Sequence, residues 1–377
     1  MPARKKVVVT GASGLVGSAA IRHFASLGDW DVVGVSRRLP ANLGPYADRV
    51  EHVSVDLTDA ERCAAVFGQM SDVTHVIYAA VYEKDDVVDG WQAADQMQTN
   101  RSMLVNLFEP LEAAAGGLEH VSLLQGTKAY GVHKLWPQQW FSTPAREDEP
   151  RYEHPNFYWL QQDYLTDKQQ GKSWTYTIWR PVLIFGDPIG SNLSVISVLG
   201  AYAALEREAG RPLSYPGGPP YPMQAVDVDL LVHAMHWATT TDASHCEIFN
   251  VSNGDVFVWQ NVWPVIADAF DMAVGDPAPR SLTEELPARA DEWAAIVDRH
   301  ELAAPRDLRA FIGGSTSLTD YSLAYGAKEP VPPKIVSTVK LRKAGFHEYM
   351  HTDDMFRKWI ARLHELRYVP SGQVAAL

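Results

Sequence analysis

The amino-acid sequence predicts an α/β protein, with a doubly wound parallel sheet and a smaller, mostly helical C-terminal domain. Short β-rich runs alternate with helical stretches through the first half, a pattern typical of parallel strands joined by helical crossovers. After Gly186 the pattern changes to Pro/Gly-rich loops and helices rich in tryptophan. The chain has 377 residues, and at ~100–200 residues per domain this length suits two domains.

Each element of the first half is predicted from an apolar run and the residues that end it. Strands are expected over 6–10, 31–36, 52–55, 73–80, 118–124 and 174–180. Helices are expected over 15–27, where Gly28 follows, over 95–115, where two glycines follow, and over 156–170, where Asn156 is suited to cap the start.

The second half is predicted to divide between two domains. Loops at 188–192 and 215–222 flank a helix over 193–208, and a strand over 247–251 could return to the first sheet. We therefore predict a first domain over 1–186 with a returning segment near 224–252. The second domain, which would bind substrate, is assembled from 187–223 and 253–377.

Composition excludes several classes of protein. The formal net charge of -13 argues against nucleic acid as the main partner, because phosphate binding needs a net basic face. There is no apolar run of ~18 residues and no signal-peptide core, so no membrane association is expected. The two cysteines favour a reducing compartment, and together these features predict a cytoplasmic protein.

Histidines do not predict a metal site. There are thirteen of them, and His233 and His236 stand three apart on a probable helix face. Because no third ligand has a suitable spacing, we expect no bound metal.

The strongest local signal is the stretch VVVTGASGLVGSAA, which contains Gly11, Gly14 and Gly17 between a strand and a helix. Glycines allow the backbone to turn tightly and to approach a pyrophosphate at the helix N-terminus. The strand, loop, helix and second strand together predict a Rossmann-type dinucleotide-binding domain. The alternative is a tight turn without a ligand. The predicted contacts in this loop are Gly11, Ser13, Gly14, Leu15, Val16 and Gly17.

The end of the second strand predicts which cofactor is used. Ser36, Arg37 and Arg38 stand where a free ribose hydroxyl would be held by Asp or Glu, and no acidic residue is present there. A guanidinium can pair with a 2′-phosphate, which favours NADPH/NADP+ over NAD. The alternative is that both arginines are solvated surface residues.

The GxxGxxG spacing resembles the short-chain dehydrogenase/reductase superfamily. That resemblance adds further cofactor contacts at the ends of the third and fourth strands, namely Asp56, Leu57, Ala79 and Ala80. Members of this superfamily normally use Tyr-x-x-x-Lys on one helix, where the lysine lowers the tyrosine pKa. Tyr130–Lys134 and Tyr164–Lys168 match the pattern, but neither is well placed.

Three other stretches carry a more specific resemblance. They are LQGTKAYG at 124–131, PNFY at 155–158 and FNVSNGDVFVW at 249–259. Together they resemble the progesterone 5β-reductase/iridoid synthase-like enzymes, an atypical branch of the extended short-chain dehydrogenases. The resemblance implies that the catalytic lysine is Lys128 and the catalytic tyrosine is Tyr158, with further cofactor contacts at Gln125, Tyr158, Pro181, Val182 and Ile184.

The position of this pair is sensible without the resemblance. A lysine at the carboxyl end of the fifth strand and a tyrosine opening the next helix both face the crevice where a nicotinamide would lie. The chain departs from the family pattern at Gln125, at Trp159 and at 161–163, where an acidic pair is usual. These departures leave the pair intact and concern the shape of the pocket.

The resemblance implies 1,4-reduction of the activated C=C bond of an enone or enal. The expected substrate is a small apolar carbonyl compound, and the protein is expected to be a monomer or a homodimer. The helix near 194–202 and the loop 215–222 are expected at the substrate pocket, with the loop as a lid on glycine hinges. Nearby Tyr202, Tyr221 and Phe356 suit an apolar substrate, although each is a candidate core residue.

Two other functions remain open at this point. One is a different extended short-chain dehydrogenase activity: carbonyl reductase, sugar-nucleotide epimerase or dehydratase. The other is a non-catalytic NADP-binding sensor, which would need the glycine loop and the arginines but neither Lys128 nor Tyr158.

Overall fold

A computed structural model describes residues 4–41, 43–84, 93–132, 142–151, 154–187, 189–329 and 331–371. The chain forms two compact units. Unit 1 contains 1–182, 228–252 and 336–348, and unit 2 contains 183–227, 253–335 and 349–377. These boundaries lie within a few residues of the predicted ones, except that 336–348 joins unit 1.

Unit 1 is built on a seven-stranded sheet in the order β10-β6-β5-β4-β1-β2-β3. All of its strand pairs are parallel, which confirms the predicted fold class. The strands are β1 (Lys5–Thr10), β2 (Trp30–Val35), β3 (Val50–Val53), β4 (His75–Tyr78), β5 (His120–Leu124), β6 (Thr175–Pro181) and β10 (Glu247–Val251).

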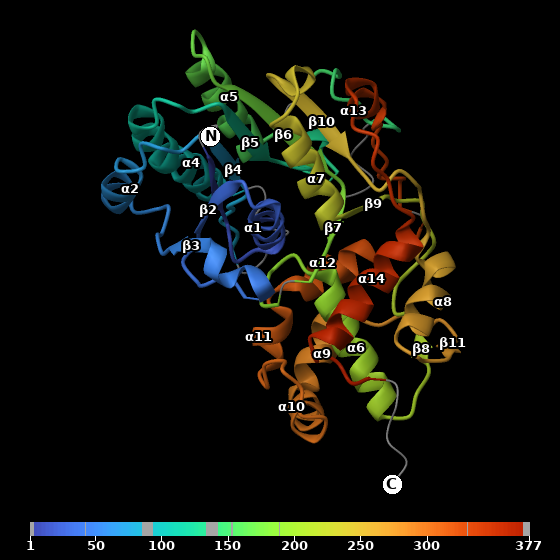
Figure 1. The fold of residues 1–377 in the computed structure, drawn as a ribbon. Helices are drawn as coiled ribbons and strands as arrows, with labels where there is room; N and C mark the ends of the chain where they lie inside the picture. Colours follow the sequence, from blue (N-terminus) through green and yellow to red (C-terminus); the bar gives the residue numbers. More distant parts are fainter. Residues whose placement is uncertain are drawn as a thin grey trace. The chain divides into compact units, whose positions relative to one another are not determined.

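Helices cover this sheet in two groups (Figure 1). The helices α1 (Leu15–Leu27) and α7 (Val228–Ala238) pack against each other. On the other side α4 (Ala94–Ala114) packs between α2 (Ala60–Phe67) and α5 (Phe157–Gln169). Short 3-10 helices lie at η1 (Gly44–Arg49), η2 (Thr127–Tyr130) and η3 (Asp242–Ser244).

The central strands form because their side chains are apolar on both faces. Val7, Val8 and Val9 of β1 are fully buried, as expected for a parallel strand with helices on each side. A large apolar cluster joins β4 and β5 to the inner faces of α2, α4 and α5. At ~25 cal/mol per Å² of apolar surface buried, such clusters are the main stabilising force of the sheet.

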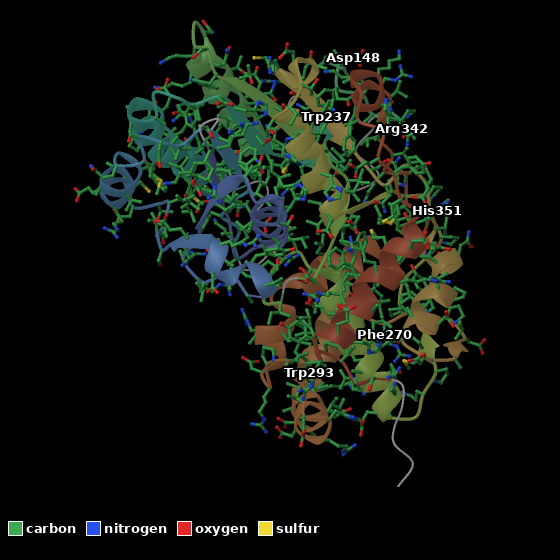
Figure 2. The ribbon with its side chains drawn as sticks, in the orientation of Figure 1. Asp148, Trp237, Phe270, Trp293, Arg342 and His351 are labelled. Atoms are coloured by element: carbon green, nitrogen blue, oxygen red, sulfur yellow. The ribbon has the colours of Figure 1, made fainter. Side chains whose placement is uncertain are left out.

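The return of residues 336–348 to unit 1 depends on contacts that lie far apart in the sequence. Val336 bridges Ala145, and α13 (Val339–Ala344) packs on β10. Trp237 of α7, labelled in Figure 2, packs its ring against those of Phe249 and Phe346. These contacts bury the edge of the sheet at β10.

Unit 2 is mostly helical and is arranged around α6 (Val195–Glu208), whose first twelve residues are buried. Trp293 of α10 stacks on Phe311 of α11 with ring centroids 4.8 Å apart (Figure 2). The other helices are α8 (Trp259–Ala269), α9 (Leu282–Ala288), α10 (Ala290–Arg299), α11 (Leu308–Ile312), α12 (Ser315–Ser322) and α14 (Thr352–Glu365). Two small parallel pairs complete the unit: β7 (Leu183–Phe185) with β9 (Ala225–Asp227), and β8 (Leu213–Ser214) with β11 (Val274–Gly275).

The loop 215–222 differs from the hinged lid expected from its glycines. The Tyr215 and Tyr221 hydroxyls donate hydrogen bonds to the carbonyls of Leu323 and Ser322. A Cβ at Gly217 would collide with the Leu323 carbonyl, so this glycine permits close backbone packing. The aromatic candidates Tyr202, Tyr221 and Phe356 are all buried core residues of this unit.

Two further findings concern the environment of the chain. Within the described ranges, no helix combines the length and apolar character needed to cross a bilayer. Cys63 is a buried free thiol and Cys246 an exposed one. The cytoplasmic location stays a prediction.

Candidate active site

The glycine-rich loop follows β1 and leads directly into α1. Gly11 has φ 66°, a left-handed conformation that suits glycine, and its carbonyl accepts a hydrogen bond from the Gly14 N–H at 2.8 Å. A Cβ at Gly17 would collide with the Gly11 carbonyl. Helix α1 therefore begins tightly against the loop only because position 17 has no side chain.

The start of α1 has the character of an anion site. Its N-cap residue, Gly14, makes no side-chain capping hydrogen bond, and no acidic residue lies in the first turn. The first N–H groups of the helix and its dipole favour negative charge at this point. Ser13 is half-buried in the loop, whereas Leu15 and Val16 are buried behind it.

The ends of β1 and β4 are tied together beside this loop. Thr10 Oγ1 accepts hydrogen bonds from the N–H groups of Ala79 and Ala80, at 3.1 and 3.2 Å. A Cβ at Gly11 would lie 2.6 Å from the Ala79 carbonyl oxygen. The predicted contacts Gly11, Ala79 and Ala80 therefore do lie together at the carboxyl edge of the sheet.

The tip of β2 presents both predicted arginines to solvent. Arg37 and Arg38 are exposed, while Ser36 is nearly buried and donates a hydrogen bond to the Arg38 carbonyl at 2.6 Å. The ring of His52 lies 3.2 Å from the Ser36 hydroxyl oxygen. His52 was not among the predicted site residues, because the sequence alone does not show the pairing of β2 with β3.

Asp56 follows β3 and forms a turn with Thr58. Its carboxylate accepts hydrogen bonds from the N–H and hydroxyl of Thr58, at 2.9 and 2.8 Å. The Thr58 N–H bond lowers the Asp56 pKa, and the charge of Arg37 lowers it further. Leu57 is buried, and its carbonyl accepts from Asn106 on α4.

Lys128 and Tyr158 come from separate elements and meet in one place. Lys128 lies in η2, directly after β5, and Tyr158 is the second residue of α5. The Lys128 Nζ lies 5.8 Å from the centre of the Tyr158 ring and 5.7 Å from that of Phe157. Both distances lie within the range of a cation–π contact, which brings the ammonium to the faces of the two rings.

Asn156 joins the two segments that carry this pair. Its side-chain oxygen caps α5 by accepting from the Tyr158 N–H, and its amide donates to the Lys128 carbonyl at 3.0 Å. The imidazole of His154 lies 3.1 Å from the same carbonyl. The predicted cap at Asn156 is confirmed, and it also fixes the lysine segment.

The Tyr158 side chain is buried, yet its hydroxyl makes no hydrogen bond to any part of the chain that the structure describes. Gly126 is what leaves room for this hydroxyl, because a Cβ there would lie 3.3 Å from the phenol oxygen. Burial raises the Tyr158 pKa above its usual value, and the charge of Glu83 raises it further. The phenol is therefore neutral at physiological pH and retains a free proton to donate.

The electrostatics of Lys128 follow from burial and one nearby carboxylate. Burial lowers the Lys128 pKa, whereas Glu83, with Oε1 at 3.7 Å from Nζ, opposes that fall. Arg180 acts on Tyr158 in the opposite sense to Glu83 and lowers the phenol pKa. Glu83 was not predicted as a site residue, because it lies 45 positions from Lys128 in a segment without a recognisable motif.

A buried network of hydrogen bonds holds the backbone of Tyr158 in place. Gln125 donates to the Tyr158 carbonyl at 3.0 Å and accepts from Arg180 Nε at 3.3 Å. Arg180 also donates to the Tyr130 hydroxyl, which itself donates to Asn250 Oδ1 at 2.7 Å. Gln125 therefore links the Tyr158 backbone to Arg180, and the cofactor contact predicted for it stays a prediction.

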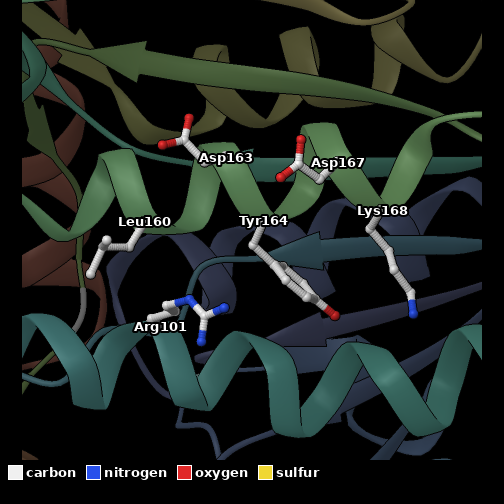
Figure 3. Close-up of a pocket in the computed structure, with 6 residues that line it drawn as sticks. All are labelled: Arg101, Leu160, Asp163, Tyr164, Asp167 and Lys168. Atoms are coloured by element: carbon white, nitrogen blue, oxygen red, sulfur yellow. The ribbon is translucent and has the colours of Figure 1, made fainter.

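The Tyr-x-x-x-Lys matches elsewhere have other roles. The Tyr130 phenol is engaged with Asn250, and Lys134 lies outside the described residues. Tyr164 and Lys168 point toward α4 from the wall of a surface pocket of about 370 Å³ (Figure 3). Both bind Glu109 of α4, at 2.9 and 2.6 Å, so this pair ties two helices together.

The predicted contacts after β6 fall at the boundary between the two units. Pro181 ends β6, and Val182 is the last residue of its segment of unit 1, whereas Ile184 lies in β7 of unit 2. The Val182 N–H donates to the Val251 carbonyl at 3.1 Å. That N–H is therefore not free to donate to a nicotinamide carboxamide.

A metal centre does not form among the described residues, where no group of three or more His, Cys, Asp or Glu side chains could hold an ion. His233 instead pairs with Glu348 at 2.7 Å, and His236 contacts the ring of His23 at 3.1 Å. These histidines belong to the packing between α1 and α7.

The parallel sheet and the glycine loop between β1 and α1 are those of an extended short-chain dehydrogenase. A family model for the NAD dependent epimerase/dehydratase family matches residues 7–252. The chain belongs to this family, whose members use nicotinamide cofactors.

Curated relatives specify the branch. The chain is 29% identical to (S)-8-oxocitronellyl enol synthase of Antirrhinum majus, over 96% of this chain and 92% of the relative. It is 27% identical to 3-oxo-Delta(4,5)-steroid 5-beta-reductase of Arabidopsis thaliana, with the same coverage. These relatives confirm the resemblance to the progesterone 5β-reductase/iridoid synthase-like enzymes.

Solved structures agree on the fold. UDP-glucose 4-epimerase of Thermotoga maritima superposes with a TM-score of 0.65 at 15% identity, covering 96% of this chain and 99% of that one. The Thermus thermophilus UDP-glucose 4-epimerase in complex with NAD gives 0.62 at 19% identity, covering 95% and 99%. At such identities the likeness concerns the fold alone.

Proposed function

We propose that this protein is an NADPH-dependent reductase that carries out 1,4-reduction of enones or enals. The observation that carries the proposal is the meeting of Lys128 and Tyr158 in one buried place, with the phenol proton not used by the described chain. The relatives whose names denote an enol synthase and a steroid 5-beta-reductase support the same reaction class.

The residues present fit a nicotinamide dinucleotide phosphate. A Cβ at position 17 would fill the space beside the Gly11 carbonyl, so the loop needs glycine there. The start of α1, which no side chain caps, suits a pyrophosphate. Arg37 and Arg38 are exposed at the tip of β2, where they would meet a 2′-phosphate. When bound, NADPH supplies the hydride that adds to the β-carbon of the substrate.

The protein's own part is to stabilise the charge that develops on the substrate carbonyl oxygen. Tyr158 donates a hydrogen bond to that oxygen, and the positive charge of Lys128 favours the resulting enolate. Preorganised donors of this kind are typically worth about 2.7–4 kcal/mol of transition-state stabilisation. The burial of Tyr158 and the partial burial of Lys128 strengthen their action, because less water screens them.

The alternative activities receive less support from the geometry. If Tyr130 were the catalytic acid, its phenol would have to give up its hydrogen bond to Asn250. A sugar-nucleotide diphosphate would need a basic site in unit 2, where Arg207 donates to the Pro370 carbonyl and Arg211 to Glu206. We therefore treat carbonyl reduction and epimerisation as outcomes of the test.

The test follows NADPH oxidation with a cyclic enone, an open-chain enal, a steroid enone, a saturated ketone and a saturated aldehyde. Saturated carbonyl products from the enones and enal alone are expected, identified by mass and NMR. Tyr158→Phe should lower kcat by roughly 100-fold or more while NADPH binding, followed by fluorescence, is retained.

Tyr164→Phe is the matched control, because it removes a phenol that is bound to Glu109 on the far side of α5. Its activity should stay within about twofold of the wild type. Consumption of saturated carbonyls only, or an allylic alcohol product, would show an ordinary carbonyl reductase. Full activity of Tyr158→Phe would point to a protein that binds NADP without using this pair.

A further inference from the structure

We propose that Glu83 is a positioning residue that holds the ammonium of Lys128 beside the phenol of Tyr158. The inference rests on the proposed function, since it concerns how that reaction's two groups are arranged. None of the sequence motifs includes Glu83, and its place at the site is visible only in the folded chain.

The first support is where the Glu83 carboxylate lies. Its side chain is 5% exposed, and its Oε1 lies 3.7 Å from Lys128 Nζ, whose side chain is 18% exposed. Burying a carboxylate without compensation is costly, so a carboxylate that is 5% exposed beside a half-buried ammonium indicates that the two charges compensate each other.

The second support is that the backbone around Glu83 is held on both sides. The N–H of Tyr82 donates to Asn100 Oδ1 at 2.8 Å, and the Asn100 amide donates back to the Tyr82 carbonyl at 2.9 Å. The N–H of Lys84 donates to Gln96 Oε1 at 3.1 Å. Asn100 and Gln96 are fully buried on α4, so the segment after β4 is fixed where it carries Glu83.

The third support is the sense in which Glu83 acts on the pair. Its negative charge favours the ammonium form of Lys128 and disfavours the phenolate form of Tyr158. Both effects preserve the state that donates a hydrogen bond to an enolate: a charged lysine and a neutral phenol.

Other groups around the pair act differently. Arg180 faces Tyr158 from β6 and favours the phenolate, which opposes Glu83. His154 precedes α5, and its imidazole contacts the Lys128 carbonyl. Tyr130, from η2, is bound to Arg180 and Asn250. Glu83 is therefore the carboxylate whose removal should be felt by both Lys128 and Tyr158.

The experiment measures the pH profile of kcat/KM for Glu83→Gln and Glu83→Asp, using the most rapidly reduced enone of the panel. Without the carboxylate, both pKa values fall, so the basic limb should move to lower pH by about one unit. Glu83→Asp keeps the charge on a shorter stem, farther from the Lys128 ammonium, so its basic limb should move in the same direction by a smaller amount. NADPH binding should be unchanged in both variants.

The matched control is Asp95→Asn, which removes an exposed carboxylate that pairs with Lys84, the residue next to Glu83. It should leave the pH profile as in the wild type. A wild-type profile for Glu83→Gln would overturn the inference. If Glu83→Gln does not fold, as judged by thermal unfolding, the pH profile of Glu83→Asp decides. A basic limb at lower pH than that of the wild type supports the inference. A basic limb at the same pH as that of the wild type overturns it.

Lys128→Met and Tyr158→Phe, assayed in parallel, separate the two proposals. If both variants lose activity while Glu83→Gln keeps the wild-type profile, only the role of Glu83 fails. If both variants remain fully active, the proposed reaction mechanism itself fails, whatever Glu83 does.

Discussion

Arg180 illustrates how a single buried charge can prepare a site for an anion. The residue is 4% exposed, and its guanidinium donates to Gln125, Tyr130 and Gln162, which are all neutral. Among the described residues no carboxylate forms an ion pair with it. This buried cation faces Tyr158, where it favours negative charge and opposes the effect of Glu83.

Cofactor preference is also set by single residues. Replacing Arg37 and Arg38 together with Ala should raise the Kd for NADPH by roughly 10–100-fold, because charge-assisted hydrogen bonds are worth about 1.5–3 kcal/mol. The Kd for NADH should change little, since NADH lacks the 2′-phosphate. Fluorescence titration with both cofactors measures the ratio.

Arg62→Ala is the control for this double variant, because Arg62 is an exposed arginine of α2 and not of the β2 tip. It should leave both affinities unchanged. Equal weakening of NADH and NADPH by the Arg37/Arg38 substitutions would contradict a role in reading the 2′-phosphate.

At the scale of elements, the start of α5 joins helix stability to the geometry of the site. Asn156→Ala removes both the cap to the Tyr158 N–H and the bond to the Lys128 carbonyl. We expect a loss of about 1–2 kcal/mol in unfolding free energy, measured by urea denaturation, together with a lower kcat.

Asn156→Asp separates these two effects. Aspartate keeps the oxygen that caps α5, but it has no amide to donate to Lys128. Because only the cap is restored, this variant should recover part of the unfolding free energy lost in Asn156→Ala and still show reduced kcat. A wild-type kcat in Asn156→Asp would mean that the tie to Lys128 does not matter for catalysis.

The elements of unit 1 were largely predictable because their signals are local. The predicted helix over 15–27 and the predicted strand over 247–251 have the bounds found in the structure. A glycine or a proline marks the end of many other helices and strands. Helix α2 was not predicted, because its eight residues carry a short and weak apolar pattern. The return of 336–348 was missed as well, because its partners lie about 90 to 190 positions earlier in the chain.

Residues of the candidate site were predictable only where they stand in a recognisable sequence motif. Lys128 and Tyr158 stand in stretches typical of a known family, and the structure brings them together. Glu83, His52 and Arg180 act through contacts between strands or loops, and no local pattern reports such contacts. The Tyr164–Lys168 match shows the converse, because it has the catalytic spacing but serves to join α4 and α5.

At the scale of the whole molecule, buried histidines make stability depend on pH. Burial lowers the pKa of His23 to about 4 and the pKa values of His75 and His120 to about 3. In the unfolded chain each would titrate near 6.5. The folded state therefore binds fewer protons between these values, and its stability falls as pH falls below about 6.5.

The expected slope is about 1.4 kcal/mol of unfolding free energy per pH unit for each such histidine between pH 6 and 4. Urea denaturation at several pH values measures it. His120→Gln should reduce the slope, whereas His347→Gln, at an exposed position, should not. A slope that is the same in His120→Gln as in the wild type would argue against this source of acid sensitivity.

The path of the chain between its two units has a consequence for its synthesis on the ribosome. Unit 1 needs residues 336–348, and the Asn250 amide reaches the Ser337 carbonyl at 3.2 Å. Synthesis runs at roughly 5–20 residues per second, so the nascent chain waits many seconds with the β10 edge of its sheet uncovered. Chains released early, before residue 348, would expose that apolar edge, and truncated products should be cleared by chaperones and proteases rather than accumulate as a free nucleotide-binding unit.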